Sequence, residues 1–371
     1  MNKFFKIENY WRNIDKHILS SFLLLLTLGI FFSFSSTSFL ADERLNKGYY
    51  FFFQKHLIYA FLSFFLMFLI SIINTDLINK SLLPIFLFFL LLLILVPFFG
   101  VEVKGAKRWL SFSIFRFQPI EFIKPFFILM IAQIITSNWF KNSSLAHLIS
   151  FVMLSIIISL LVIQPDLGQS VLLISTWISL IFVSGVSLLF FPLILTFVII
   201  LFFVLLYIAP EKFSYIITRL TSFLDPEKSG NFQSEKATEA IKQGGLKGQG
   251  MGEGILKESV PEAHTDYIIA VVSEEFGSVV SILIIGIFLF IAFRIIKKIV
   301  NFSNNFYKLS LSGLMSLLIF QTFIHVGVNA NLLPTTGMTL PFLSYGGSSL
   351  LSNGIIAGVI LNYTSLTEKI E

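Results

Sequence analysis

Cysteine is absent from this 371-residue chain, and charged side chains are scarce. Without cysteine, the protein has no disulfide, no thiolate nucleophile and no cysteine-based metal site. Charged residues make up 13% of the chain, which is about half the share found in soluble domains. Hydrophobic residues make up 56%. This composition argues against a soluble protein.

The apolar residues are gathered in long runs that carry almost no charge. Each run has about 17 to 25 residues, enough for one helix to cross a bilayer. Helices and closed barrels are the structures that satisfy their backbone polar groups in lipid, and barrel strands alternate in polarity. The runs do not alternate, so we predict an all-α polytopic integral membrane protein with about ten transmembrane helices. The predicted spans lie near 18–40, 56–73, 82–99, 120–136, 147–163, 170–187, 190–209, 267–294, 309–328 and 344–363.

Positive charge orients the predicted bundle. The polar tail 1–17 and the loop after the eighth span are both rich in Lys and Arg, and the positive-inside rule places them in the cytoplasm. The first apolar run is too long for a signal-peptide core, which indicates an uncleaved first span. A single transmembrane domain, 1–371, then carries a large extracytoplasmic loop, 210–266, between helices 7 and 8. These flanking cations account for the net charge of +5 without a nucleic-acid partner.

One short loop, 100–124, conflicts with the rule because it is cationic yet lies outside in this topology. Either the topology is wrong or these cations bind an anion at the outer face, such as a lipid-linked phosphate or diphosphate. Trp109 in the same loop is an interfacial anchor or a platform for sugar stacking. The loop's cations are Lys104, Lys107, Arg108, Arg116 and Lys124.

The end of this loop predicts the start of a helix. Pro119, after Gln118, suits a first helical turn. Glu121 and Lys124, three residues apart, then share one face and can pair. The pair is either an internal salt bridge that makes both charges tolerable or a part of the site.

A glycine-rich segment, 244–254, reads GGLKGQGMGEG. It is not a Walker loop, because no Gly-Lys-Ser/Thr follows. Glycine at this density predicts a backbone that turns sharply or approaches a neighbour closely. The preceding residues, 232–243, are predicted to form a short helix.

An ionisable cluster stands where the polar stretch enters the eighth span. Ionisable groups near a membrane are costly and tend to be functional. Asp266 is either a helix N-cap or a general base. The cluster comprises Glu262, His264, Thr265 and Asp266, with Glu274 and Glu275 further on.

Two more segments complete the outer face. Residues 333–349 hold two prolines and three glycines, which predicts a loop folded into the outer mouth. Residues 164–168, QPDLG, predict a turn between the fifth and sixth spans. Cations, carboxylates and a folded loop therefore converge on one surface, which favours one external site for an anionic, membrane-bound substrate.

Five motifs together resemble those of the SEDS family (shape, elongation, division and sporulation proteins). They are GAKRW, QPIEFIKP, QPDLG, PEAHTDYIIAVVSEEFG and LPTTGMTLPFLSYGGSS. The resemblance covers nearly the whole chain and is closer to the division (FtsW) type than to the elongation (RodA) type. It implies a ten-helix peptidoglycan glycosyltransferase that polymerises lipid II outside the cytoplasmic membrane, at the division septum. A class B penicillin-binding protein and other divisome membrane proteins would be its partners.

The resemblance also implies residue roles. Asp266 would be the catalytic base that takes the proton of the acceptor sugar's 4-hydroxyl, with inversion at the attacked carbon. Cations would stabilise the leaving undecaprenyl diphosphate. A divalent cation, Mg²⁺ or Mn²⁺, could share that task, although the sequence shows no metal motif. The predicted substrate-binding residues are Lys107, Arg108, Trp109, Gln118, Glu121, Lys124, Glu262, His264, Thr265 and Ser344.

The chain departs from the family pattern in places. Thr336 stands where many division-type members have lysine, and Ile120 where a small residue is usual. The alternatives are an elongation polymerase, a flippase for lipid II and a non-catalytic division scaffold.

Overall fold

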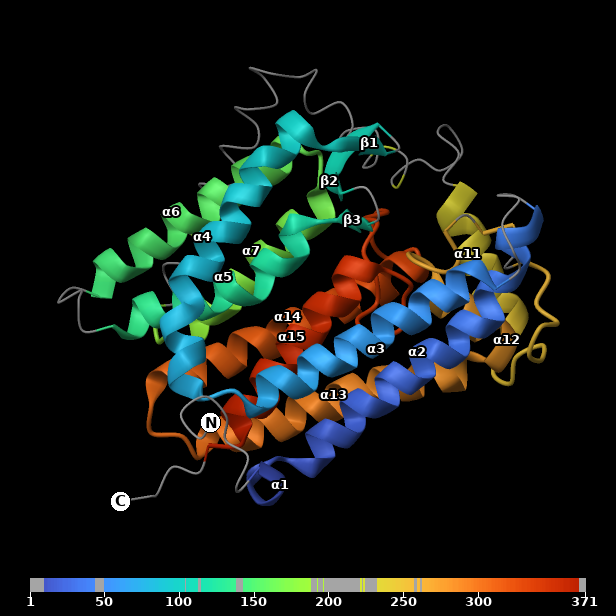
Figure 1. The fold of residues 1–371 in the computed structure, drawn as a ribbon. Helices are drawn as coiled ribbons and strands as arrows, with labels where there is room; N and C mark the ends of the chain where they lie inside the picture. Colours follow the sequence, from blue (N-terminus) through green and yellow to red (C-terminus); the bar gives the residue numbers. More distant parts are fainter. Residues whose placement is uncertain are drawn as a thin grey trace.

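Long helices dominate the computed structural model, which describes residues 10–43, 50–103, 105–112, 115–137, 143–187, 192, 196, 221, 223, 232–256, 259–260 and 262–366 (Figure 1). Seven of the described helices are long and apolar enough to cross a membrane. This confirms the prediction of an all-α polytopic membrane protein. The seven are α2 (Lys16–Glu43), α3 (Phe51–Ile72), α4 (Thr75–Phe99), α5 (Pro119–Thr136), α6 (Ser143–Ile163), α13 (Ser278–Val300) and α14 (Asn305–Asn329).

Further helices complete the described part of the chain. Helices α7 (Leu167–Val183) and α15 (Gly347–Thr364) occupy the places of the sixth and tenth predicted spans. The seventh predicted span, 190–209, lies almost entirely outside the described residues. Shorter helices are α1 (Tyr10–Asn13), α11 (Phe232–Gly244) and α12 (Ile268–Phe276). Helix α11 confirms the short helix predicted within the polar stretch, whose extracytoplasmic placement stays a prediction.

The eighth predicted span, 267–294, is wrong in its bounds. The chain breaks at Gly277 (φ 87°), which separates the short α12 from the spanning helix α13. A Cβ at this glycine would lie 2.1 Å from the carbonyl oxygen of Leu246. Apolar residues on both sides of the break hid it, because hydropathy does not register a backbone turn.

The cationic loop after α4 forms a small sheet that the sequence did not predict. Strands β1 (Val101–Val103), β2 (Ala106–Phe112) and β3 (Phe115–Phe117) pair antiparallel in the order β1-β2-β3. Lys107 lies opposite Glu102 across β1 and β2. The sheet fixes the direction of the cations, which an irregular loop would not.

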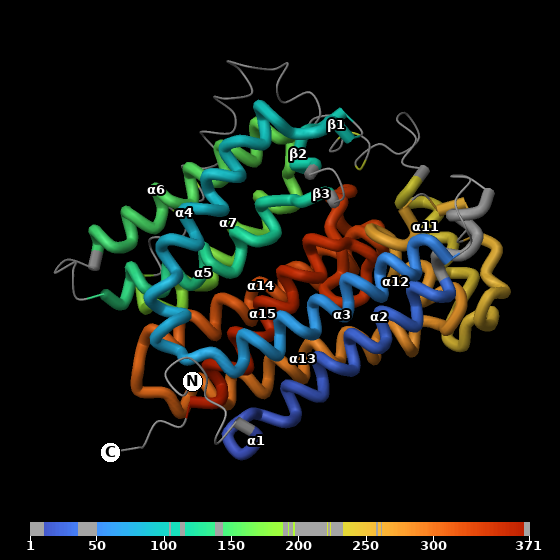
Figure 2. The backbone as a smooth tube through the Cα atoms, in the orientation of Figure 1, coloured from blue at the N-terminus to red at the C-terminus, as the bar shows by residue number. Residues whose placement is uncertain are grey.

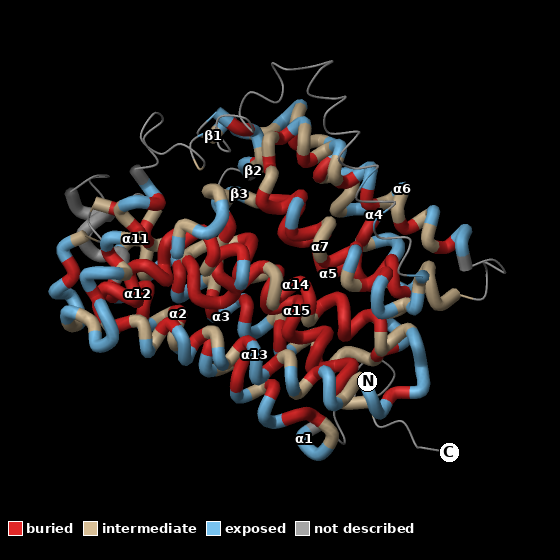
Figure 3. The backbone as a smooth tube through the Cα atoms, turned by 180° about the vertical axis from the view of Figure 1, so that it is seen from behind, coloured by how far each residue is buried: buried red, intermediate tan, exposed pale blue. Residues whose placement is uncertain are grey.

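The spanning helices form two groups that meet at α5 and α14. Helices α4, α5, α6 and α7 make one group, and α2, α3, α13, α14 and α15 make the other (Figure 1). Within the apolar stretch of each helix, 78% of the residues of α5 are buried, against 22% of those of α4. Figure 3 shows the same contrast between buried central helices and exposed outer ones. Polar side chains on α5 and α14 therefore sit inside protein rather than in lipid.

Polar contacts tie the helices at the end of the bundle near α1. Asp15 accepts hydrogen bonds from the backbone N–H groups of His17 (3.1 Å) and Ile18 (3.2 Å), which caps α2. Its other oxygen lies 2.7 Å from Nη2 of Arg294 on α13. The sheet, α11 and α12 lie away from this end (Figure 2). The predicted site motifs gather around them.

Candidate functional site

Asp266 lies in a tight turn just before α12. Its backbone N–H donates to the carbonyl oxygen of Glu262 (3.1 Å), and Glu262 adopts a positive φ of 57°. The N-cap of α12 is Tyr267, with no side-chain cap. The N-cap interpretation of Asp266 is therefore wrong, because the helix begins one residue too late. Asp266 lies at intermediate exposure.

The loop after α14 holds this turn from one side. Ser344 Oγ donates to the carbonyl oxygen of Thr265 (2.6 Å), and Tyr345 N–H donates to that of His264 (2.9 Å). The His264 ring lies 5.6 Å from the Tyr345 ring. Burial raises the pKa of Tyr345 to about 12, so its phenol stays protonated. Ser344, His264 and Thr265 thus shape the turn that carries Asp266.

The same loop connects Asp266 with the turn before α7. A Cβ at Gly337 would lie 3.6 Å from Oδ2 of Asp266, and one at Gly168 would lie 2.9 Å from Thr336 Cβ. Gly168 therefore allows a close approach of the loop, and Gly337 adopts a positive φ of 70° that favours glycine. Thr336 Oγ1 is buried with no hydrogen-bond partner in the described part of the chain. Three predicted motifs meet at this loop.

Arg108 on β2 joins the sheet to the α7 turn. Its guanidinium donates to the carbonyl oxygens of Gln164 (3.2 Å) and Pro165, and Nε lies 3.8 Å from Oδ2 of Asp166. Asp166 caps α7 by accepting from the N–H of Gln169 (3.5 Å). Burial raises the pKa of the Asp166 carboxyl, and the charge of Arg108 opposes that rise. Arg108 is thus anchored at the mouth with 16% of its side chain exposed.

The predicted pair on α5 is confirmed as an ion pair. Nζ of Lys124 lies 2.8 Å from Oε2 of Glu121, and their side chains are 1% and 4% exposed. A buried ion pair is tolerated when other hydrogen bonds satisfy its remaining atoms. Here Gln169 Nε2 donates to Oε1 of Glu121 (2.6 Å). The internal salt-bridge interpretation therefore fits this geometry.

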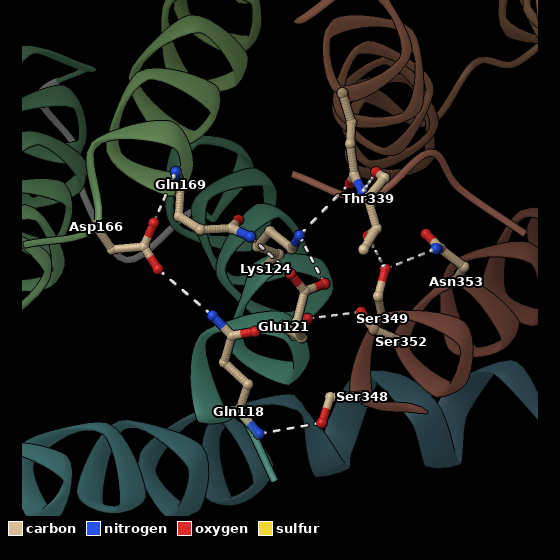
Figure 4. A network of polar contacts seen from close by, with 11 residues as sticks. Gln118, Glu121, Lys124, Asp166, Gln169, Thr339, Ser348, Ser349, Ser352 and Asn353 are labelled. Atoms are coloured by element: carbon tan, nitrogen blue, oxygen red, sulfur yellow. Dashed lines mark hydrogen bonds and ion pairs between the residues drawn. The ribbon is translucent and has the colours of Figure 1, made fainter. Parts of the chain in front are cut away.

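Figure 4 shows the wider network around this pair. Lys124 Nζ donates to Gln321 Oε1 (3.4 Å), and Gln321 Nε2 donates to the carbonyl oxygen of Thr339 (2.9 Å). Thr339 is two residues beyond Gly337, so the network reaches the loop beside Asp266. Gln118 joins it through Asp166, because Gln118 Nε2 donates to Asp166 Oδ2 (3.4 Å) and Asp166 accepts from the N–H of Gln169.

The sequence interpretation missed several members of this network. Gln169, Gln321 and Thr339 had no place among the predicted site residues. Gln321 is a polar residue inside a predicted span, and Gln169 directly precedes one, which is a signal that could have found them. Among the predicted residues, Lys107 and Trp109 lie on β2, where Lys107 is exposed and Trp109 is part-buried. Within the described ranges, no three His, Asp or Glu side chains are grouped to hold a metal ion.

The fold and site together define a polytopic membrane protein with a carboxylate-bearing and cation-bearing mouth at one end of its bundle. The FtsW/RodA/SpoVE family of cell cycle proteins matches residues 16–369. The chain belongs to this family. Its resemblance to SEDS proteins is thereby confirmed.

Comparisons with individual proteins agree with this family membership. The probable peptidoglycan glycosyltransferase FtsW of Caulobacter vibrioides is 34% identical over 355 residues, covering 95% of this chain and 89% of the relative. A chain of a peptidoglycan synthase complex superposes with a TM-score of 0.78 at 23% identity, covering 95% and 97% of the two chains. The rod shape determining protein RodA of Thermus thermophilus superposes with a TM-score of 0.70 at 22% identity, covering 95% and 96%. The two structural matches bear on the fold alone.

Proposed function

We propose that this protein is an FtsW-type peptidoglycan glycosyltransferase that polymerises lipid II at the outer face of the cytoplasmic membrane. The observation that carries the proposal is the convergence of the Asp266 turn, the 333–346 loop and the Arg108–Asp166 contact at one end of the bundle. A partly exposed carboxylate and an anchored guanidinium at the same end of the bundle suit a reaction that loses an anionic leaving group. The 34% identity to an FtsW relative supports the same activity.

In this mechanism Asp266 is the general base. The 4-hydroxyl of the acceptor sugar attacks the anomeric carbon of the diphosphate-linked glycan, and the Asp266 carboxylate takes the hydroxyl proton. The bond between the anomeric carbon and the diphosphate oxygen breaks, and its electron pair leaves with undecaprenyl diphosphate. One displacement gives a β-1,4 bond with inversion. A positioned base contributes about 10²–10⁴-fold to such a step.

The cations of β2 serve the leaving group. Arg108 and Lys107 come from one strand, and carbonyl contacts hold Arg108 while 16% of its side chain stays exposed. Lys124 is paired with Glu121, so it would act on the site through its charge and its hydrogen-bond network rather than by binding the substrate. Glu262, Thr265 and Ser344 hold the turn that presents Asp266, and Trp109 would stack on a sugar ring.

The proposal extends to partners and location. The match to a chain of a peptidoglycan synthase complex, described as coordinating polymerization and crosslinking, supports a class B penicillin-binding protein as partner. The division-type relatives support a septal position beside other divisome membrane proteins.

The first experiment incubates purified protein, alone and with its class B penicillin-binding protein, with labelled lipid II. Parent protein with its partner should make long glycan, and Asp266→Ala should make none. Glu239→Ala is the matched control, since Glu239 is an exposed carboxylate on α11 that pairs with Lys236. Such an exposed pair contributes little to stability.

Each result has a consequence for the proposal. Glycan that persists in Asp266→Ala would keep the polymerase class and remove Asp266 as the base. Folded protein that makes no glycan with its partner, yet moves labelled lipid II across a vesicle bilayer, would replace the proposal with a flippase. Neither activity, together with intact binding to the partner, would indicate a scaffold.

A further inference from the structure

Two adjacent glutamates lie buried at the C-terminal end of α12. Glu274 is 0% exposed and Glu275 is 1% exposed. A buried carboxylate is costly unless it is hydrogen-bonded, and negative charge at a helix C-terminus also opposes the helix dipole. Groups from elsewhere in the chain must therefore compensate both side chains.

The compensation comes from residues 244–256, which we call the glycine collar. Its Leu256 N–H donates to Glu274 Oε1 (2.7 Å), and its Gly252 N–H donates to Glu275 Oε1 (3.2 Å). Ser35 Oγ on α2 donates to Glu275 Oε2. The collar thus holds both carboxylates with backbone donors that substitution cannot easily remove.

The collar also caps the backbone of α12. The last carbonyl groups of a helix have no partner within the helix. Here the N–H groups of Gln249 and Gly250 donate to the carbonyl oxygens of Glu274 and Glu275, both at 2.9 Å. The collar therefore binds the C-terminal end of α12 through both the backbone carbonyl groups and the carboxylates of Glu274 and Glu275.

This contact between the collar and α12 requires glycine, because a Cβ atom would collide with α12. It confirms the close approach predicted from the glycine-rich segment. A Cβ at Gly248 (φ 80°) would lie 2.3 Å from the carbonyl oxygen of Glu275, and one at Gly254 would lie 2.9 Å from Cδ of Glu274. The collar follows α11, which packs on α12. The two helices and the collar form one unit.

The other end of α12 leads directly to the proposed base. Helix α12 begins at Ile268, two residues after Asp266, and every residue from Ile268 to Glu275 is buried. Asn329 of α14 accepts from the N–H of Ala270 (3.1 Å) and donates to the carbonyl oxygen of Asp266 (2.9 Å). A helix of nine residues is about 14 Å long, so α12 is a short rod between collar and base.

We propose that Glu274 and Glu275 are positioning residues for the glycosyltransferase reaction. They lock the collar to α12, and α12 in turn holds the Asp266 turn against the loop at Gly337. The break at Gly277 ends this rod before α13. The collar then holds its C-terminal end together with one hydrogen bond between Ser273 Oγ and Ser281 Oγ of α13 (2.8 Å). The proposal rests on the proposed function, with Asp266 as the base.

Kinetics provide the first test, on full-length protein with its partner and labelled lipid II. Glu275→Ala and Glu274→Ala should lower kcat by about 10²-fold, the loss that a misplacement of about 1 Å can bring. KM should stay close to that of the parent, because neither side chain lies at the substrate mouth. Glu274→Gln should recover much of kcat, since its amide oxygen can still accept from Leu256.

The matched control is Glu253→Ala. Glu253 is an exposed carboxylate in the same collar, so its loss changes the charge equally without releasing α12. Ser35→Ala removes one donor to Glu275 from a different helix and is the milder variant if the glutamate variants do not fold. It should give a smaller fall in kcat of the same kind.

The second test does not use activity. The chain has no cysteine, so Asp266→Cys places a single thiol at the position of the base. Its labelling rate with a maleimide should change severalfold when Glu275→Ala or Ser35→Ala is added, and not when Glu253→Ala is added. An unchanged rate in folded protein, or a fall in activity that lies in KM alone, would overturn the positioning role.

The two tests separate this proposal from the proposed function. Normal polymerisation by Asp266→Ala would remove the function of Asp266 as base. The labelling rate at position 266 would still report whether the collar controls that position.

Discussion

Positive charge reaches the candidate site from two regions, strand β2 and helix α5, and the two hold it differently. On β2, Lys107 is exposed and Arg108 is anchored by carbonyl contacts with part of its side chain accessible. On α5, Lys124 is 1% exposed and bound to Glu121 at 2.8 Å. The sequence presents all three as cations of one short loop, yet the structure divides them by burial.

This difference separates binding charge from structural charge. A cation at an exposed or partly exposed position can approach an anionic ligand without losing a protein partner. A cation in a buried pair cannot, because removing its partner leaves an uncompensated charge. We therefore expect β2 to act on substrate directly and α5 to act through the network that ends at the loop beside Asp266.

Breaking the α5 pair from one side should give the largest effect. Lys124→Met leaves Glu121 buried without its ion partner, which typically costs about 3–5 kcal/mol. Thermal unfolding of the detergent-solubilised protein should show a large drop in midpoint. Combining Lys124→Met with Glu121→Gln should recover most of the loss, since no lone charge remains. Lys124→Met as stable as the parent would contradict the structural role of the Glu121–Lys124 pair.

Arg108→Lys should have the next largest effect, because it keeps the charge and removes the planar fork. An ammonium group cannot reproduce the Nε and Nη2 contacts of a guanidinium, so we expect a stability loss of about 1–3 kcal/mol. Arg116→Lys on β3 is the matched control, since Arg116 is exposed. Parent-like unfolding and polymerisation in Arg108→Lys would show that charge alone matters on β2.

Asp166 lies between the two regions. Asp166→Asn should have a smaller effect on stability, and that effect should depend on pH. Burial raises its pKa, so the folded state binds the proton more tightly than the unfolded state. The resulting stability is fully present below the unfolded pKa of about 3.9 and is lost as pH rises through the raised folded pKa. Unfolding midpoints measured upward from about pH 4 should fall more in the parent than in Asp166→Asn. Parallel profiles would argue against this titration.

Lys107→Ala should change stability least, within about 0.5 kcal/mol, as is usual for exposed positions. Its expected effect lies in KM for lipid II at low salt, and that effect should fade as ionic strength rises, because salt screens exposed charges. Steady-state kinetics at two salt concentrations measure it. A salt-independent loss of kcat would place Lys107 among the structural charges instead.

Much of the site could be predicted from local sequence. Pro119 predicted the start of α5, and three-residue spacing predicted the Glu121–Lys124 pair, because helical geometry is local. The glycines of the collar predicted close approach, although not what they approach. Gln321 and Gln169 were missed because their partners come from other helices, 197 and 48 positions away in the chain.

The sequence by itself determined the class of protein and the order of its spans, because apolar runs and flanking charge depend only on neighbouring residues and on the solvent. Through the alternation of spans it also predicted that the motifs lie at one face of the membrane. The tertiary structure alone decided which cation is buried, that the collar grips Glu274 and Glu275, and that α12 separates from α13 at Gly277. Those outcomes depend on contacts between distant segments, whose distances and burial no local pattern encodes.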